Sequence, residues 1–216
     1  MDADRPTRIS TPALAAILTV IDRYNSSPNP TAFGQFSARK SAAPLLDKTA
    51  TSTTLVFVPA HTTTTAIGSC TIWWEGDKIT RFMLLTEVPD SVPPPDWLRP
   101  LIERVQNHLR GNHEDFIDAP YEWSLATDFQ RRVYEAALLT KSGFTATYGD
   151  LAKAIDEGPG VSRAVGTALG QNPWPLLVPC HRFVGANGKM TGFSAPGGIN
   201  TKLQLLAIEG NQMFNV

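Results

Sequence analysis

The spacing of apolar residues changes near residue 119, and this change limits most strongly what the chain can fold into. Before it, alternating segments over 64–74 and 78–85 flank a turn at 75–77, which is typical of antiparallel strands. After it, apolar residues recur at helical intervals as far as Gly210. We therefore expect an α+β protein with an N-terminal α/β domain over residues 1–118 and an all-helical C-terminal domain over 119–216.

Other elements of the N-terminal part follow from the same reasoning. Apolar residues share one face of a predicted helix over 11–24. The stretch 25–53 is rich in Ser, Thr, Ala and Pro, which indicates a loop. A strand is predicted over 54–59. A helix over 97–109 is expected to follow three consecutive prolines and to end before Gly111.

The C-terminal part predicts a series of helices. The first begins at Thr127 or Asp128, either of which can cap it, and the last covers 199–209. Between them lie a short helix over 148–155, a glycine turn, and a helix capped by Ser162. This order is the sequence form of a helix-turn-helix, although a plain helical hairpin inside a core has the same spacing.

Charge and cysteine content exclude several classes of protein. The net charge is −1, and residues 119–216 hold eight Lys and Arg against seven Asp and Glu. Any DNA binding must therefore depend on a few placed contacts and on shape. Cys70 and Cys180 are the only cysteines, so a disulfide framework is excluded and a reducing compartment fits. Cys70 lies in a strand pattern and is expected to be a buried core residue.

Membrane and secretion signals are also missing from the sequence. No run of about eighteen apolar residues predicts a membrane span. The first residues are acidic and lack a signal-peptide core. We expect an intracellular protein, cytoplasmic in a prokaryote and nuclear in a eukaryote, with no membrane partner.

The segment Val178-Pro-Cys-His-Arg-Phe-Val184 carries the strongest chemical signal. Pro179 stiffens the turn that presents Cys180. A thiol reacts as thiolate, and the adjacent His181 and Arg182 are expected to favour that form. A bare Cys-His pair favours a small buried cysteine beside a surface histidine over a catalytic pair. The neighbouring motifs decide between these interpretations.

Those motifs occur in register from residue 127 to residue 210. In order they are Thr127-Asp-Phe-Gln-Arg-Arg-Val133, Thr147-Tyr-Gly-Asp-Leu-Ala152, Ser162-Arg-Ala-Val-Gly166, Gln171-Asn-Pro173, the Pro-Cys-His-Arg segment, Asn187-Gly-Lys-Met-Thr-Gly-Phe193, Gly197-Gly198, and Lys202 with Glu209-Gly210. The stretch resembles the O6-alkylguanine-DNA alkyltransferases, or methylated-DNA–protein-cysteine methyltransferases. For the N-terminal part the resemblance implies only an outline, a small ribonuclease-H-like sheet with a helix.

The resemblance implies a DNA-repair function. The family transfers the alkyl group of O6-alkylguanine irreversibly to its own cysteine, so each molecule reacts once and no cofactor is consumed. Cys180 is the implied acceptor, and a thiolate suits SN2 attack on a saturated carbon. His181 is implied to act through water, with Glu209 orienting its ring. Asn172 is implied to brace the cysteine turn. O4-alkylthymine is a candidate second substrate.

The implied partner is double-stranded DNA, bound as a monomer through the minor groove with the target nucleotide flipped out. Arg163 corresponds to the residue that fills the gap in the duplex. Tyr148 corresponds to the tyrosine that rotates the phosphate and donates to guanine N3. Small or polar residues of the same motifs are further DNA contacts, namely Ala164, Gly149 and Gln130.

The base pocket is implied to involve Phe183, Phe193 and Ser194, although ordinary core packing is an equal interpretation for the two phenylalanines. This sequence departs from the family here. Phe193 stands where many members have tyrosine, Phe183 is bulkier than the usual aliphatic residue, and the lid over 194–198 is longer. The accepted alkyl size therefore stays open. Neither His61, His108 and His113 nor Cys70 has the spacing of a zinc site, so no metal is expected.

Two other functions are alternatives to an alkyltransferase. A non-enzymatic lesion-binding relative would flip and flag alkylguanine, but such relatives replace the cysteine. A Cys-His hydrolase would need an oxyanion-hole segment and has no use for Arg163 on a helix-turn-helix.

Overall fold

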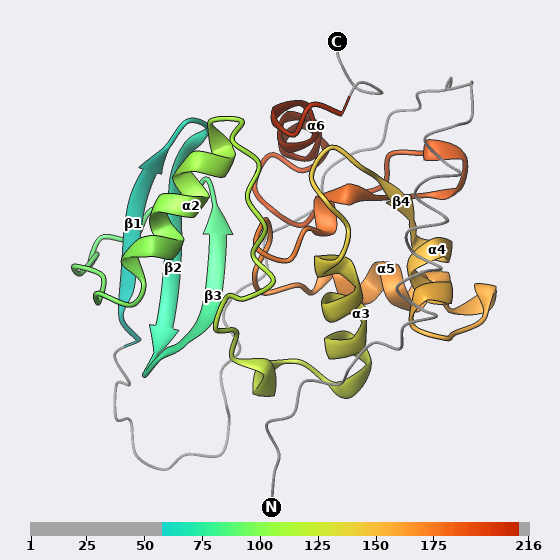
Figure 1. Cartoon of the computed structure of the whole chain (residues 1–216), viewed down its shortest axis with the longest axis horizontal. Coiled ribbons are helices and arrows are strands. Elements are labelled where there is room, and N and C mark those ends of the chain that lie inside the picture. Colours follow the sequence, from blue (N-terminus) through green and yellow to red (C-terminus); the bar gives the residue numbers. More distant parts are fainter. Residues whose placement is uncertain (1–57, 212–216) are drawn as a thin grey trace, which may run out of the picture.

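The computed structural model describes residues 58–211. Its N-terminal part is an antiparallel sheet in the order β1-β2-β3, formed by Ala60–Thr65, Gly68–Glu75 and Lys78–Leu84. Helix α2, Arg99–Leu109, packs on one face of this sheet (Figure 1). The helical remainder of the chain lies on the other side of β3 from β1. The fold is therefore α+β, as the sequence predicts.

The strand predictions need one correction. The predicted strand 78–85 matches β3, but the segment 64–74 is two strands, because Thr64 and Thr65 end β1 and the chain reverses before Gly68. This reversal lacks the usual turn residues except Gly68, which adopts a φ of 122°. The predicted strand 54–59 falls mostly outside the described residues, and its last two residues are not in a strand. The predicted helix 11–24 and loop 25–53 also lie outside them.

Helix α2 confirms the predicted helix, although it begins at Arg99 rather than Trp97. Pro100 lies in its first turn, where a missing N–H costs no helical hydrogen bond. The buried face of α2 consists of Leu101, Ile102, Val105, His108 and Leu109. One histidine is therefore part of an otherwise apolar face.

The C-terminal part contains α3 at Asp128–Leu138, α4 at Tyr148–Ala154, α5 at Ser162–Gly170 and α6 at Ile199–Ile208. Thr127 caps α3 in a capping box with Gln130, as predicted. The predicted cap of α5 is wrong. Val161 occupies that position without a side-chain hydrogen bond, and Ser162 is the first helical residue, because the 3-10 turn Pro159–Val161 leads directly into the helix.

The C-terminal part is not all-helical, contrary to the prediction. Strand β4, Ala146–Thr147, pairs in parallel with β5, Phe183–Val184. These two-residue strands are too short to leave a periodic signal in the sequence. Short 3-10 helices also occur, at Trp123–Leu125, Cys180–Arg182 and Ala186–Gly188. Strand β5 directly follows Cys180–Arg182, so the sheet anchors the cysteine segment beside the start of α4.

Helices α4 and α5 pack against each other, and both contact the 3-10 turn that connects them. Gly166 of α5 faces the Tyr148 ring, and a Cβ at Gly166 would lie 3.9 Å from that ring. The order helix, turn, helix agrees with the sequence pattern. Its role as a DNA-binding helix-turn-helix and the ribonuclease-H-like nature of the N-terminal sheet stay predictions. None of the helices within residues 58–211 has the length and apolar character needed to cross a membrane.

A single core joins the sheet to the helices through Trp174. This indole is completely buried, and its Nε1–H donates to the Ile79 carbonyl of β3 at 3.0 Å. Its ring contacts Tyr121, Trp123 and Tyr134 with centroids 5.0, 5.5 and 6.2 Å away. Both sides of the predicted boundary at 118/119 thus contribute to one core, and the boundary itself stays a prediction.

The predicted linker 112–126 contains the expected extended piece, which runs along β3. The Ile79 N–H donates to the Pro120 carbonyl at 2.7 Å, and the Glu122 N–H donates to the Ile79 carbonyl at 3.0 Å. Tyr121 and Ile79 form an isolated parallel β-bridge. The segment therefore behaves as an added edge of the sheet and holds the two parts in contact.

Replacing Trp174 with phenylalanine should lower the free energy of unfolding by about 2–4 kcal/mol, because the Ile79 carbonyl loses one of its two donors and a void remains. Urea denaturation measures this change. Trp97→Phe is the matched control, since Trp97 is 36% exposed and should change stability little. Equal effects of the two substitutions would contradict the bridging role of Trp174.

Candidate functional site

Cys180 begins the 3-10 helix Cys180–Arg182 and is only 5% exposed. Pro179 precedes it as the N-cap, and the Cys180 N–H donates to the Val178 carbonyl at 2.8 Å. Strand β5 follows immediately. The thiol is thus presented on a turn whose two ends are both fixed. Cys70, in contrast, is completely buried in β2, as expected for a core cysteine.

Asn172 braces this turn, as expected from the resemblance. Its Nδ2–H donates to the Val178 carbonyl at 2.9 Å, and its Oδ1 accepts the Trp174 N–H at 2.9 Å. Its side chain also lowers the pKa of the Cys180 thiol, against the larger effect of burial. The alternative role, a helix C-cap, falls to Gln171. One amide therefore connects the end of α5 to the reactive turn.

The expected source of thiolate stabilisation is wrong. Burial raises the pKa of the Cys180 thiol, and the groups that oppose this effect are Asn172, Lys202 and the backbone N–H groups of Cys180 and His181. The guanidinium of Arg182 binds Glu209 instead of the thiol. Adjacent positions in sequence do not decide where long side chains point, and the 3-10 turn sends Arg182 away from Cys180.

Lys202 is the cation that acts on the thiol. It lies on α6, is buried, and donates from Nζ to the Phe183 carbonyl. Burial lowers the pKa of the Lys202 ammonium to about 8, against the attraction of Cys180. Sequence reasoning included Lys202 in the family motif without a role. The feature that could have indicated its role is its place on the buried face of α6, because a buried lysine needs a polar partner.

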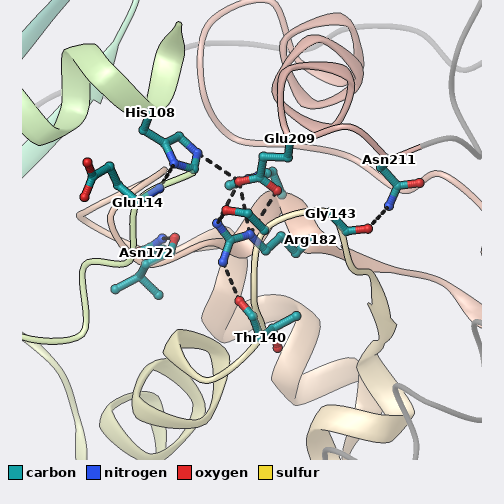
Figure 2. A network of polar contacts seen from close by, with 11 residues as sticks. His108, Glu114, Thr140, Gly143, Asn172, Arg182, Glu209 and Asn211 are labelled. Atoms are coloured by element: carbon teal, nitrogen blue, oxygen red, sulfur yellow. Dashed lines mark hydrogen bonds and ion pairs between the residues drawn. The ribbon is translucent and has the colours of Figure 1, made fainter. Parts of the chain in front are cut away.

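Glu209 is the centre of a buried polar cluster (Figure 2). Glu209 occupies the C-cap position of α6 and is 1% exposed. Its Oε1 contacts His181 Nε2 at 2.9 Å, His108 Nε2 at 3.0 Å and Arg182 Nη2 at 2.7 Å. Arg182 Nε also donates to Oε2 at 3.0 Å. The predicted orientation of His181 by Glu209 agrees with this geometry.

Arg182 connects the cluster to the loop that follows α3. Its Nη1–H donates to the Thr140 carbonyl and its Nη2–H donates to Ser142 Oγ at 2.8 Å. The same loop closely approaches the end of α6, where a Cβ on Gly143 would lie 3.1 Å from the Glu209 carbonyl oxygen. Gly143 has a φ of 83°, so both its backbone and its surroundings require glycine.

The electrostatics of the cluster favour an ionised Glu209 and a neutral His181. Burial would raise the pKa of the Glu209 carboxyl, but His181, His108 and Arg182 outweigh it and hold that pKa far below its usual range. Burial lowers the pKa of the His181 imidazole, against the pull of Glu209. With Nε2–H donating to Glu209, Nδ1 carries the free lone pair, and within residues 58–211 it has no hydrogen-bond partner.

His108 is a member of the cluster that sequence reasoning missed. The sequence suggests His108 only as a candidate metal ligand. Its contact with Glu209 is not predicted, because 101 residues separate the two in the chain. The available signal was its place on the apolar face of α2, where a buried histidine needs a polar partner. No group of three or more His, Cys, Asp or Glu that could hold a metal ion occurs in the described part of the chain.

The predicted DNA-contacting residues lie around α4 and α5. Arg163 and Ala164 are exposed on the first turn of α5, where they line an open depression with Gly160, Ser162 and Thr167. Tyr148 begins α4, and its Oη hydrogen-bonds Thr191 Oγ1 at 2.7 Å. Burial raises the pKa of the Tyr148 phenol, and Cys180 adds to the effect, so this ring lies near the thiol.

Of the two other predicted DNA contacts, only Gln130 has a local structural role. Gly149 follows Tyr148, and a Cβ there would meet Ser162 Oγ at 3.5 Å, which is ordinary contact. Gln130 completes the capping box of α3, and its Nε2–H donates to Gln171 Oε1 at 2.7 Å. The side chain of Gln130 therefore ties α3 to the end of α5.

The predicted pocket residues differ in exposure. Phe183 is 1% exposed within the core, Phe193 is half-buried against it, and Ser194 is exposed. The segment 194–198 is tied to α6, because Thr201 Oγ1 donates to the Pro196 carbonyl at 2.6 Å. A Cβ at Gly197 would lie 2.2 Å from Thr201 Oγ1, so this glycine permits the close approach.

The chain is similar to known DNA methyltransferases. Residues 128–211 match the family model described as 6-O-methylguanine DNA methyltransferase, DNA binding domain. A methylated-DNA–protein-cysteine methyltransferase of Mycobacterium tuberculosis is 36% identical over 148 residues, which is 66% of this chain and 87% of that protein. The chain belongs to the methylated-DNA–protein-cysteine methyltransferase family. A family member from Methanosarcina acetivorans is 39% identical over 144 residues, covering 63% of this chain and 87% of its own.

Solved structures of methyltransferases of this family have the same fold. The crystal structure of Mycobacterium tuberculosis OGT in complex with DNA matches with a TM-score of 0.60 at 35% identity, over 71% of this chain and 93% of that one. The O6-methylguanine-DNA methyltransferase of Pyrococcus kodakaraensis matches with a TM-score of 0.52 at 25% identity, over 71% and 99%. The α+β architecture is thus that of these methyltransferases.

Replacing Glu209 with glutamine should lower the free energy of unfolding at pH 7 by about 3–5 kcal/mol, because buried Arg182 loses its counter-charge. The folded pKa of Glu209 is depressed, so its stabilisation is present above the unfolded value of about 4.3 and is lost as pH falls. Between about pH 5 and pH 3, the unmodified protein should lose stability as Glu209 becomes protonated in the unfolded chain, and the variant should lack this loss.

Urea denaturation across this pH range measures the difference. Glu103→Gln on the exposed face of α2 is the matched control and should follow the unmodified protein. Parallel pH dependence of the Glu209 variant and the unmodified protein would rule out an ionised, stabilising Glu209. The pKa of His181 is lowered in the folded protein, so His181 also makes the free energy of unfolding fall in acid. This contribution of His181 should persist in the Glu209 variant.

Proposed function

We propose that this methyltransferase repairs DNA by moving the alkyl group of O6-alkylguanine onto Sγ of Cys180. The observation that carries the proposal is the arrangement around the thiol. Asn172 braces Cys180, and the neighbouring His181 is neutral with its Nε2–H held by Glu209. The name and DNA complex of the Mycobacterium tuberculosis relatives support the same activity.

The chemistry follows from the protonation states. A water molecule relays the thiol proton to Nδ1 of His181, which carries the free lone pair. The Sγ thiolate attacks the alkyl carbon, an S–C bond forms, and the C–O6 bond breaks with its electron pair staying on the guanine oxygen. Tyr148 donates to guanine N3 and stabilises the charge left on the base. The thioether has no leaving route, so each molecule reacts once and consumes no cofactor.

His181 and Lys202 offset the unfavourable pKa of the thiol in different ways. Burial disfavours the Cys180 thiolate at rest. His181 accepts the proton, and the Lys202 ammonium compensates the new negative charge. Because burial raises its pKa, the resting thiol stays protonated and is less reactive toward adventitious electrophiles, which suits a residue that can react once.

We propose that duplex DNA binds across α4 and α5 through its minor groove, with the α4–turn–α5 unit acting as a helix-turn-helix and the protein as a monomer. The guanine O6 is stacked inside the duplex, so the nucleotide must be flipped out. Arg163 is exposed at the start of α5 and can stack in the gap with its guanidinium plane. Ala164 and Gly149 let the backbone approach the groove, and Gln130 adds a polar contact.

The flipped base is proposed to lie against Phe183 and Phe193, with the Ser194 N–H and the carbonyls of Cys180 and Phe183 at its edge. The lid 194–198 then governs the accepted alkyl size and any reaction with O4-alkylthymine. Residues 119–216 are proposed to hold the acceptor and the DNA-binding surface, and residues 1–118 to support them. The intracellular location stays a prediction.

Incubation with duplex DNA containing radiolabelled O6-methylguanine should place one methyl group on the peptide that contains Cys180. Cys180→Ala should abolish this transfer while DNA binding persists, since the thiol forms the S–C bond but is not needed for the duplex contacts. Cys70→Ala is the matched control and should transfer normally. An intact lesion, or label on another peptide, would refute the proposal. Peptide mass spectrometry locates the label.

Arg163→Ala should slow repair of duplex DNA by roughly ten- to a hundredfold, as expected for the loss of one stacking contact. Its reaction with free O6-benzylguanine should change little, because no base has to be flipped. Single-turnover rates with both substrates measure the ratio. Arg81→Ala, an exposed arginine on β3, is the control and should leave both rates unchanged. Equal loss on the two substrates would contradict the flipping role.

A further inference from the structure

His108 reaches the acceptor cluster from the N-terminal part of the chain (Figure 2). It lies on the last turn of α2 and is 1% exposed. Its Nε2 lies 3.0 Å from Glu209 Oε1, the same oxygen that binds His181 Nε2 at 2.9 Å. The two imidazoles therefore share one acceptor atom.

The backbone of the following loop determines which nitrogen of His108 carries the proton. The Glu114 N–H donates to His108 Nδ1 at 3.1 Å (Figure 2). A nitrogen that accepts an N–H cannot itself carry a proton, so the His108 proton lies on Nε2. His108 is therefore a neutral donor to the Glu209 carboxylate.

Arg104, one helical turn before His108, holds this loop. Its Nη1–H and Nη2–H donate to the two carboxylate oxygens of Asp118 at 3.0 and 2.9 Å, and Nη2–H also donates to the Asp115 carbonyl. Its guanidinium lies 5.4 Å from the centroid of the Phe116 ring. The Phe116 and His108 rings meet edge to face, with their centroids 5.6 Å apart. The amide and the aromatic ring that fix His108 thus belong to one anchored loop.

We propose that His108 is a positioning residue for alkyl transfer, acting on His181 through Glu209. This inference rests on the proposed function. Arg182 holds Glu209 from the side of the loop after α3, and His108 holds it from the side of α2. Together they fix Oε1 within hydrogen-bond distance of His181 Nε2. A fixed Oε1 keeps the proton of His181 on Nε2 and its lone pair on Nδ1, where the thiol proton must arrive.

The test compares two replacements of His108. His108→Phe keeps a ring against Phe116 but removes the donor, and His108→Gln keeps an N–H that can reach Oε1. We expect the Phe variant to react about tenfold more slowly with both duplex O6-methylguanine and free O6-benzylguanine, the order for one hydrogen bond to a charged group. Its Kd for duplex DNA should stay within about twofold, since Glu209 is only 1% exposed. The Gln variant should recover most of the rate.

His113→Phe is the matched control, because His113 is exposed in the same loop and should react at the normal rate. A Phe variant as fast as the unmodified protein would overturn the inference. A Gln variant as slow as the Phe variant would also overturn it, because the role would then be packing alone.

Nitrogen-15 NMR of the imidazoles in the unmodified protein gives a second measurement that needs neither activity nor a folded variant. The four histidines of the chain make assignment practical. A protonated Nε2 and bare Nδ1 in His108 support the inference, and a protonated Nδ1 overturns it. If the unmodified protein accepts no alkyl group from either substrate, the proposed function fails, while the NMR result still decides the state of His108.

Discussion

The rest of the site depends on one buried carboxylate, Glu209. Taking a carboxylate out of water is costly, and it remains ionised here because Arg182 supplies a counter-charge and two imidazoles supply hydrogen bonds. These partners come from α2, from the cysteine turn and, through Arg182, from the loop after α3. The interaction therefore does two things at once. It joins distant segments of the chain, and it leaves His181 neutral with its basic nitrogen free.

The thiol is controlled by the same balance between burial and placed polar groups. Burial keeps Cys180 protonated at rest, while Asn172, Lys202 and two backbone N–H groups are arranged to receive the thiolate when it forms. A preorganised environment of this kind costs no rearrangement at the moment of reaction. The exposed first turn of α5 provides the contrast, since Arg163 is available to a partner while the acceptor stays enclosed. The proposed DNA-binding surface and the proposed acceptor thus differ in their access to solvent.

Local sequence patterns predict much of the fold and part of the site. The antiparallel strands, α2, the Thr127 cap of α3, the end of α6 and the Asn172 brace follow from short-range spacing and motif. The failures have physical causes. The turn before Gly68 lacks the usual turn residues, so the sequence predicts one strand where the structure has two. Val161 replaced Ser162 as the cap because a 3-10 turn enters the helix. Two-residue β4 and β5 are too short for periodicity, and Arg182 points away from the thiol because a 3-10 turn rotates it.

The sequence by itself determined the kinds of elements, the order of the motifs and the place of the candidate nucleophile Cys180, because these depend on residues close together in the chain. Only the tertiary structure decided which cation faces the thiol, which proton His181 carries, and that His108 meets Glu209 across 101 residues. The physical reason is burial. Desolvation and shared hydrogen bonds set protonation states inside the protein, and they exist only after distant segments have packed together.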